Sequence, residues 1–141
     1  MEITASFDVE RDASAVFTSL NDLEKVGLCI SGVKEVKAIS SEESTWKVDI
    51  RVGIFSLKTN LTARVTERVP PSKMVFSATG MNIDLLASIT LVPTGSGTTV
   101  NSLLEIHPSG PLGPAIDLVG ASTQKKLVQE TIANLKKYLA A

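Results

Sequence analysis

Residues 55–66 read FSLKTNLTARVT, and this stretch decides the fold. From Phe55 to Val65 every second side chain is apolar or small, and the side chains between them are polar. Such alternation predicts a β-strand with one face on a core and the other in water. Residues 46–52, which read WKVDIRV, repeat the pattern. The two stretches therefore predict neighbouring strands joined by a tight turn that starts at Gly53.

The same period of two recurs along most of the chain. Further strands are expected over residues 2–9, from Val33 onward, and over Met74–Gly80, Asp84–Val92 and Thr98–His107. Their connections are short and rich in turn residues, which favours an antiparallel meander. Between the first two strands we expect two short helices, capped at their N-termini by Asp12 and Asn21.

The C-terminal part of the chain has helical periodicity. After the proline- and glycine-rich residues 108–114, apolar side chains recur with a period of 3.6. This predicts a helix of about 26 residues and ~39 Å. Its sheet-facing side chains are Leu127, Val128, Thr131, Ile132, Leu135, Tyr138 and Leu139. An apolar sheet face needs a cover, so the fold class is α+β, one domain over residues 1–141 with the sheet wrapped around the helix.

The first half of this helix carries the functional clue. Traced backwards, the sheet-facing stripe reaches only small or polar residues: Gln124, Ala121, Gly120, Asp117 and Gly113. One interpretation is a bend at Gly120 that returns apolar residues to the core. The other is a continuous helix with a void beneath it that holds a ligand. An outward apolar lip for a partner or a membrane then follows, formed by Leu112, Ile116 and Val119.

The ligand-binding hypothesis names its residues. The expected apolar walls are inward strand residues, for each of which ordinary core packing is the alternative: Trp46, Val48, Leu57, Leu61, Phe76, Met81, Leu85 and Leu104. Asp117 and Gln124 are the polar candidates for orienting a ligand, with Gly120 beside them. Solvated helix residues are the alternative for the polar pair.

Composition excludes several classes of function. The net charge of −1 and the lack of a basic stripe argue against nucleic-acid binding. The single cysteine, Cys29, allows no intrachain disulfide, which favours a cytoplasmic location, and its expected role is that of a small buried apolar residue. No secretory signal or membrane span is apparent, and no residue cluster suggests a metal site or a cofactor.

Catalysis finds little support in the sequence. The only histidine, His107, shares a strand face with Glu105, and such a pair can act as acid and base. Leu104 and Ile106 take the inward face, however, which leaves His107 outside or at the rim. No nucleophile elbow or phosphate-binding loop is present. We therefore expect a protein that is not an enzyme.

The order of several segments resembles the carbon monoxide dehydrogenase CoxG-like family, within the START/Bet v 1-like (SRPBCC) superfamily. The similar segments include Val16–Asp22, Cys29–Val33, the strand from Trp46 to Gly53 followed by Phe55–Lys58, and the helix from Leu112 to Leu139. Ser31 departs from the family, which has proline at this position.

The resemblance implies a helix-grip fold with about seven antiparallel strands, two small helices after the first strand and a long C-terminal helix. It also implies a cavity for a hydrophobic small molecule, such as a lipid or isoprenoid quinone, in the service of a molybdenum-containing dehydrogenase. Two alternatives remain. One is an assembly or membrane-recruitment adaptor that contacts molybdenum hydroxylase subunits, and the other is a polyketide-cyclase-like enzyme.

Overall fold

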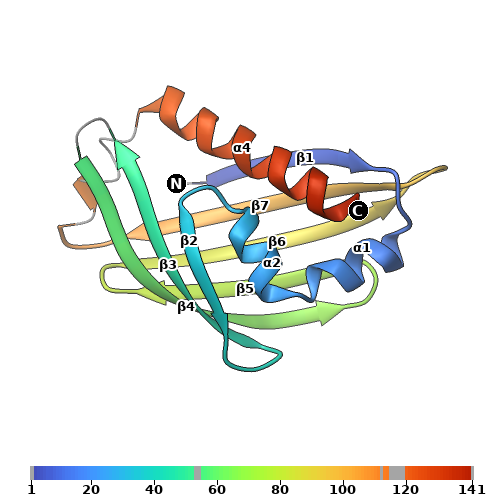
Figure 1. The fold of residues 1–141 in the computed structure, drawn as a ribbon, viewed down its shortest axis with the longest axis horizontal. Coiled ribbons are helices and arrows are strands. Elements are labelled where there is room, and N and C mark those ends of the chain that lie inside the picture. The colour runs from blue at the N-terminus through green and yellow to red at the C-terminus, as the bar shows by residue number, and fades with distance from the viewer. Residues whose placement is uncertain (1, 53–54, 112, 115–119, 141) are drawn as a thin grey trace.

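A computed structural model describes residues 2–52, 55–111, 113–114 and 120–140, and leaves out the side chains of Val52, Phe55 and Leu57. In these residues seven strands form one antiparallel sheet (Figure 1), with the spatial order β1-β7-β6-β5-β4-β3-β2. The strands are β1 (Glu2–Val9), β2 (Val33–Ala38), β3 (Glu43–Val52), β4 (Phe55–Val69), β5 (Lys73–Gly80), β6 (Ile83–Pro93) and β7 (Thr98–Pro108).

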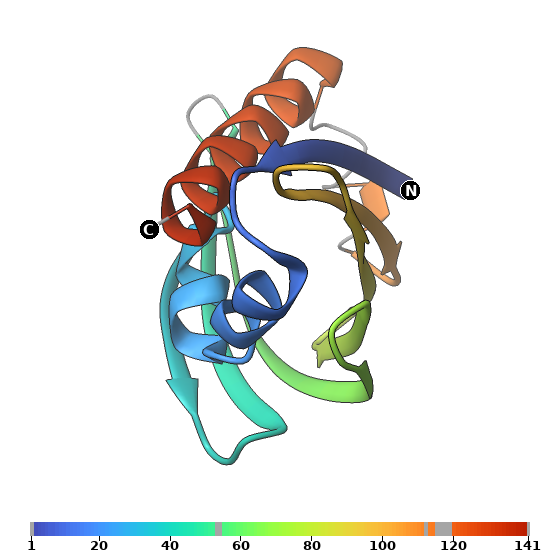
Figure 2. The ribbon, with the colours of Figure 1, turned by 90° about the vertical axis from the view of Figure 1, so that its right-hand side faces the viewer.

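Two short helices follow β1 and lie within the curve of the sheet, as Figure 2 shows. They are α1 (Ala13–Leu20) and α2 (Leu23–Cys29). Asp12 caps α1 as predicted, because its Oδ1 accepts a hydrogen bond of 2.7 Å from the amide of Ala15. The cap expected at Asn21 is wrong by one residue. Asp22 caps α2 through the amide of Lys25, and Asn21 ends α1.

The long C-terminal helix, α4 (Ala121–Leu139), crosses the mouth of the curved sheet (Figure 1). Its predicted sheet-facing residues are buried or half-buried, and the lysines on its opposite side are exposed. Polar contacts tie its second half to the two short helices. The Tyr138 hydroxyl donates to the carbonyl of Ser19 at 2.7 Å, and the Asn134 amide donates to that of Cys29 at 3.1 Å.

The helix is shorter than the sequence predicted. It has 19 residues rather than about 26, because Gly120 is an extended N-cap with φ −65° and ψ 163°. The continuous helix is therefore wrong, because Gly120, the residue where a bend was the alternative, is itself not helical. Glycine favours such a break because it gives up the most backbone freedom on entering a helix.

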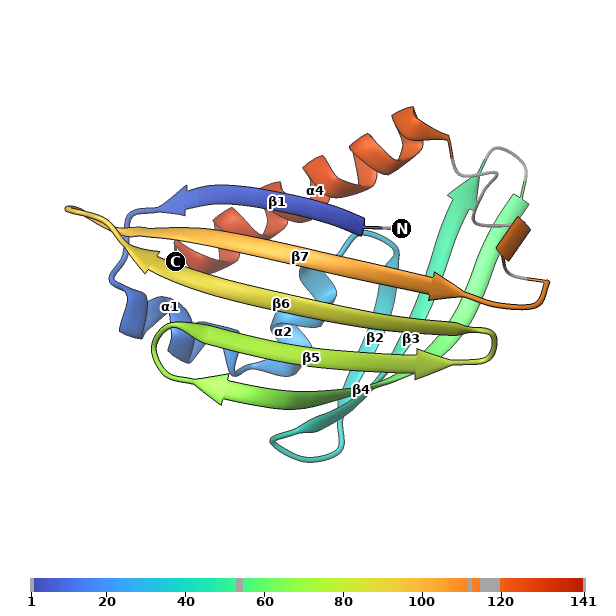
Figure 3. The ribbon, with the colours of Figure 1, turned by 180° about the vertical axis from the view of Figure 1, so that it is seen from behind.

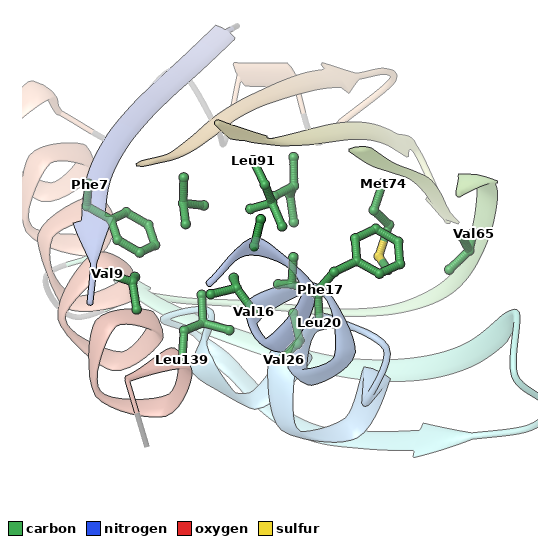
Figure 4. Packing of buried hydrophobic residues seen from close by; sticks show 13 residues of the cluster. Phe7, Val9, Val16, Phe17, Leu20, Val26, Val65, Met74, Leu91 and Leu139 are labelled. Atoms are coloured by element: carbon green, nitrogen blue, oxygen red, sulfur yellow. The ribbon is translucent and has the colours of Figure 1, made fainter. Parts of the chain in front are cut away.

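The main core fills one end of the sheet's concave inner face. Figure 4 shows side chains from α1, α2, α4 and the strands converging there. Val16, Leu20 and Leu139 are at most 1% exposed. We call this region the closed end, and define it by Phe7, Val9, Val16, Phe17, Leu20, Leu91, Val100 and Leu139.

Candidate ligand-binding site

The inner face of the sheet is apolar along most of its length. Strand partners directly opposite each other share a face, so the register aligns Ile3 with Leu104 and Leu104 with Ala87. The neighbouring row aligns Ile106 with Leu85 and Leu85 with Ala78. Since Ala78 and Ala87 are buried, the leucines and isoleucines of these rows also point to the inside of the curve.

These larger side chains are nevertheless only half-buried. We call them the open end: Ile3, Val48, Leu85, Leu104 and Ile106. Val48, Leu85 and Ile106 pack against the second core cluster around Trp46 and Leu61. The open end lies where β1 begins and β7 ends, on the side away from α1 (Figure 3). Apolar side chains that point inward and still meet solvent are a surface that a hydrophobic ligand could cover.

Beside the main core, the structure leaves a small residual cavity of about 20 Å³, walled mainly by apolar side chains of α1, α2 and strands β3–β5. Trp46 and Phe76 line it with their rings 5.8 Å apart. The indole N–H of Trp46 donates to the Ser44 hydroxyl at 2.8 Å, which satisfies its one polar atom. A space of this size holds about one water molecule, so it does not hold a lipid.

Most of the predicted wall residues lie on the inner face. Trp46 and Leu61 are buried, and Val48, Phe76, Leu85 and Leu104 are half-buried. Leu57 pairs with Ile50 between β4 and β3, but its side chain lies outside the described part of the chain.

Met81 was wrongly predicted as a wall residue. It is 83% exposed, in the turn between β5 and β6. The next residue, Asn82, has a φ of 63° and completes this turn. A side chain at a hairpin tip is not bound by the alternation of the strands that flank it, so the period-two pattern did not apply there.

The structure does not place the described candidate residues of the C-terminal helix around a ligand pocket. Gly120 is exposed, and its neighbourhood is empty within 4 Å of where a Cβ would stand, so it is not a wall of a described pocket. Gln124 is half-buried on the first turns of α4 and has a polar partner. Asp117, as well as the proposed lip of Leu112, Ile116 and Val119, lies outside the described residues.

Two features of the candidate site were missed in the sequence. Ile3 and Ile106 belong to the open end, and the alternation of their strands had already placed both on the inner face. The second feature is a polar groove of about 330 Å³ beside α4, whose lining includes Lys34, Asp49 and Arg51. No short motif marks this groove, because it is assembled from β2, β3 and α4.

The catalytic candidates are separated from the inner face. His107 is exposed and pairs across the ladder with Asp84, on the outer face of the sheet. Burial raises the pKa of the Cys29 thiol, which keeps it protonated and poorly nucleophilic at neutral pH. Over the described ranges there is no group of three His, Cys, Asp or Glu side chains placed to hold a metal. Among those same residues, no helix is long and apolar enough to span a bilayer.

Solved structures share this architecture. A conserved protein from Geobacillus kaustophilus superposes with a TM-score of 0.78 at 18% identity, covering 99% of this chain and 95% of that one. A START superfamily protein from Mycobacterium smegmatis gives 0.69 at 16% identity, covering 99% and 94%. The di-domain ARO/CYC StfQ from the steffimycin biosynthetic pathway gives 0.63 at 12% identity, and the match covers 98% of this chain and half of that protein. At these identities the likeness establishes a helix-grip, START-like fold and no more.

Sequence comparison adds the family. No curated protein matches the chain. A family model described as "polyketide cyclase / dehydrase and lipid transport" matches residues 1–140, almost the whole sequence. The chain therefore belongs to the polyketide cyclase/dehydrase and lipid transport family.

Proposed function

We propose that this protein binds a hydrophobic small molecule on the inner face of its sheet. The observation that carries the proposal is the contrast between the two ends of that face. At the closed end, side chains from three helices bury the strand residues. At the open end, Leu85, Leu104 and Ile106 point the same way and remain half-exposed. Covering such side chains with an apolar ligand is favourable by roughly 25 cal/mol per Å² of buried surface.

The chemistry of the inner face favours binding over catalysis. General acid–base chemistry needs a titratable group within hydrogen-bond reach of the substrate. Among the described strand residues that point inward, the ionisable one is Arg68, which lies opposite the buried Met74 far along β4. Its guanidinium donates to the carbonyl of Ser41 at 2.6 Å, which holds it away from the open end. We therefore propose a non-catalytic member of a family whose description includes both cyclases and lipid transport.

For the ligand we propose a lipid or an isoprenoid quinone, which the protein presents to a molybdenum-containing dehydrogenase. This finer proposal rests on the resemblance of Cys29–Val33 and of the Trp46 strand to the carbon monoxide dehydrogenase CoxG-like family. We further propose peripheral contact with membranes, and a cytoplasmic location on the ground that Cys29 is the single cysteine.

Native mass spectrometry of the purified protein, followed by solvent extraction, tests the proposal. We expect a bound apolar species at a defined stoichiometry, and extraction then identifies its class. A clean unliganded mass that persists after addition of quinones and fatty acids would contradict it. That result would favour an adaptor that recruits dehydrogenase subunits and whose inner face binds nothing.

A further inference from the structure

The polar groove beside α4 has features of a binding site in its own right. It lies between the first turns of α4 and the neighbouring strands β2 and β3, which run side by side in Figure 1. Its volume of about 330 Å³ is at the lower end of the range for small-molecule sites. The residues that line it are Ser31, Gly32, Lys34, Asp49, Ile50, Arg51, Thr123, Lys126, Leu127 and Glu130.

The charged groups of this groove differ in whether they have polar partners among the described residues. Glu130 accepts a hydrogen bond of 2.6 Å from the Ser31 hydroxyl and faces Lys126 at 4.0 Å. Lys34 and Arg51, by contrast, form no ion pair with any residue in the described ranges. The groove therefore offers two cations without an ion-pair partner among the described residues, beside the carboxylate of Asp49.

Asp49, which also lines the groove, has a carboxylate oxygen without a hydrogen-bond donor among the described residues. Its Oδ1 atom is buried and has no hydrogen-bond partner in the described part of the chain. A buried acceptor without a partner is costly, and a bound molecule that donates a hydrogen bond would remove that cost. Since Asp49 is among the residues that line the groove, a rotation of its side chain would bring this acceptor to a hydroxyl group bound beside the two cations.

The groove also adjoins the apolar interior. Ile50 lines it and belongs to the same strand face as Trp46 and Val48, two residues apart in each step along β3. Asp49 and Arg51 belong to the opposite face, so the groove takes in residues from both faces of β3. Leu127 lines it from α4 and is half-buried on the sheet-facing side of that helix. An apolar chain attached to a group in the groove could follow these two side chains towards the open end.

We propose that this groove binds a phosphate group that carries a neighbouring hydroxyl, as glycerol phosphate does. Lys34 and Arg51 contact the phosphate, and Asp49 accepts a hydrogen bond from the hydroxyl. The inference rests on the proposed function, since it makes the groove the headgroup site of the ligand whose chain covers the open end. The same chemistry occurs in a free glycerol phosphate, and the experiment below separates the two sources.

The test is isothermal titration calorimetry with four compounds, each used below its micelle concentration. They are 1-oleoylglycerol 3-phosphate, the neutral 1-oleoylglycerol, oleyl phosphate, which lacks the glycerol hydroxyl, and glycerol 3-phosphate. We expect 1-oleoylglycerol 3-phosphate to bind about tenfold more tightly than 1-oleoylglycerol, a modest preference because the cations are exposed. The double variant Lys34→Gln/Arg51→Gln should lose this preference. The matched variant Lys136→Gln/Lys137→Gln, on the exposed side of α4, should keep it.

A separate substitution in the same experiment tests whether Asp49 recognises the hydroxyl group. Asp49→Ala removes the acceptor, and it changes the charge beside the phosphate in the same way for both phosphorylated lipids. The change in the ratio of their affinities therefore reports on the hydroxyl. We expect 1-oleoylglycerol 3-phosphate to bind a few-fold more tightly than oleyl phosphate in the wild type, and this ratio to fall towards one in Asp49→Ala.

The outcomes separate the two proposals. Equal affinities for the phosphorylated and neutral oleoyl lipids would overturn the headgroup site and leave the proposed function standing. Binding of glycerol 3-phosphate that the Lys34→Gln/Arg51→Gln variant loses, with no binding of the three lipids, would support the groove as a site for the free compound and would contradict a lipid on the open end. Absence of binding by all four compounds would overturn the headgroup site and a lipid as the ligand, and the native mass spectrometry described above then decides for or against a quinone.

Discussion

Replacing Leu104 by glutamate is expected to lower the affinity for an uncharged apolar ligand by about 100-fold or more. Leu104 lies in the middle of the open end, between Ile3 on β1 and Ala87 on β6. A carboxylate there either loses its hydration beneath the ligand or keeps water in the site, and both disfavour binding by several kcal/mol. A fluorescence titration with the neutral probe N-phenyl-1-naphthylamine measures the affinity of each variant for an uncharged apolar ligand.

The neighbouring residue supplies the control. Leu103 is also half-buried, but it pairs with Thr4 and Ser88 on the outer face of the same strand. Leu103→Glu should therefore bind the probe like the wild type. Circular dichroism and thermal unfolding establish that both variants are folded. Equal loss of binding in the two variants, or none in Leu104→Glu, would contradict a site on the inner face.

The largest effect on stability is expected at Gly97, in the turn between β6 and β7. A Cβ at this position would collide with the carbonyl oxygen of Val9 and stand 3.1 Å from the Cα of Glu10. Both obstacles are backbone, so no side chain can rotate away. The turn cannot withdraw easily either, because Thr98 is fully buried and its hydroxyl donates to the carbonyl of Arg11 at 2.8 Å.

We expect Gly97→Ala to lower the free energy of unfolding by about 3 kcal/mol. For a domain of this size, this corresponds to a fall of roughly 10 °C in Tm. Gly95→Ala is the matched control in the same turn, since its added Cβ meets no atom within 4 Å. Its Tm should stay within about 2 °C of the wild type. A Gly97→Ala variant as stable as Gly95→Ala would show that β1 does not approach this turn so closely.

The strands could be predicted closely because one face of the sheet is buried and the other is wet. The β4 pattern read from Phe55 to Val65 continues in the structure to Val69, with an irregular register between Val65 and Glu67. The burial of α4 also follows its sequence pattern, because period 3.6 fixes which side chains meet the sheet. Local periodicity was sufficient wherever a regular element packs on a single core.

The candidate site could be predicted only in part, for physical reasons. The pattern continues through Gly120, but nothing in a periodicity tells whether the backbone itself stays helical there. Met81 followed the alternation and yet lies on a turn, where the strand geometry no longer holds. The groove with Lys34, Asp49 and Arg51 depends on the approach of α4 to β2 and β3, and a tertiary contact of this kind leaves no trace in local spacing.

The most direct test of the account is a methyl NMR titration with a neutral apolar ligand, such as dodecanol. If the ligand covers the inner face, the methyl signals of Leu85, Leu104 and Ile106 should shift or broaden on addition. Those of Leu20 and Leu139, which are at most 1% exposed at the closed end, should change far less. Unchanged open-end methyl groups at saturating ligand, or changes confined to the exposed Leu86 on the outer face, would contradict the central claim that the open end binds a hydrophobic molecule.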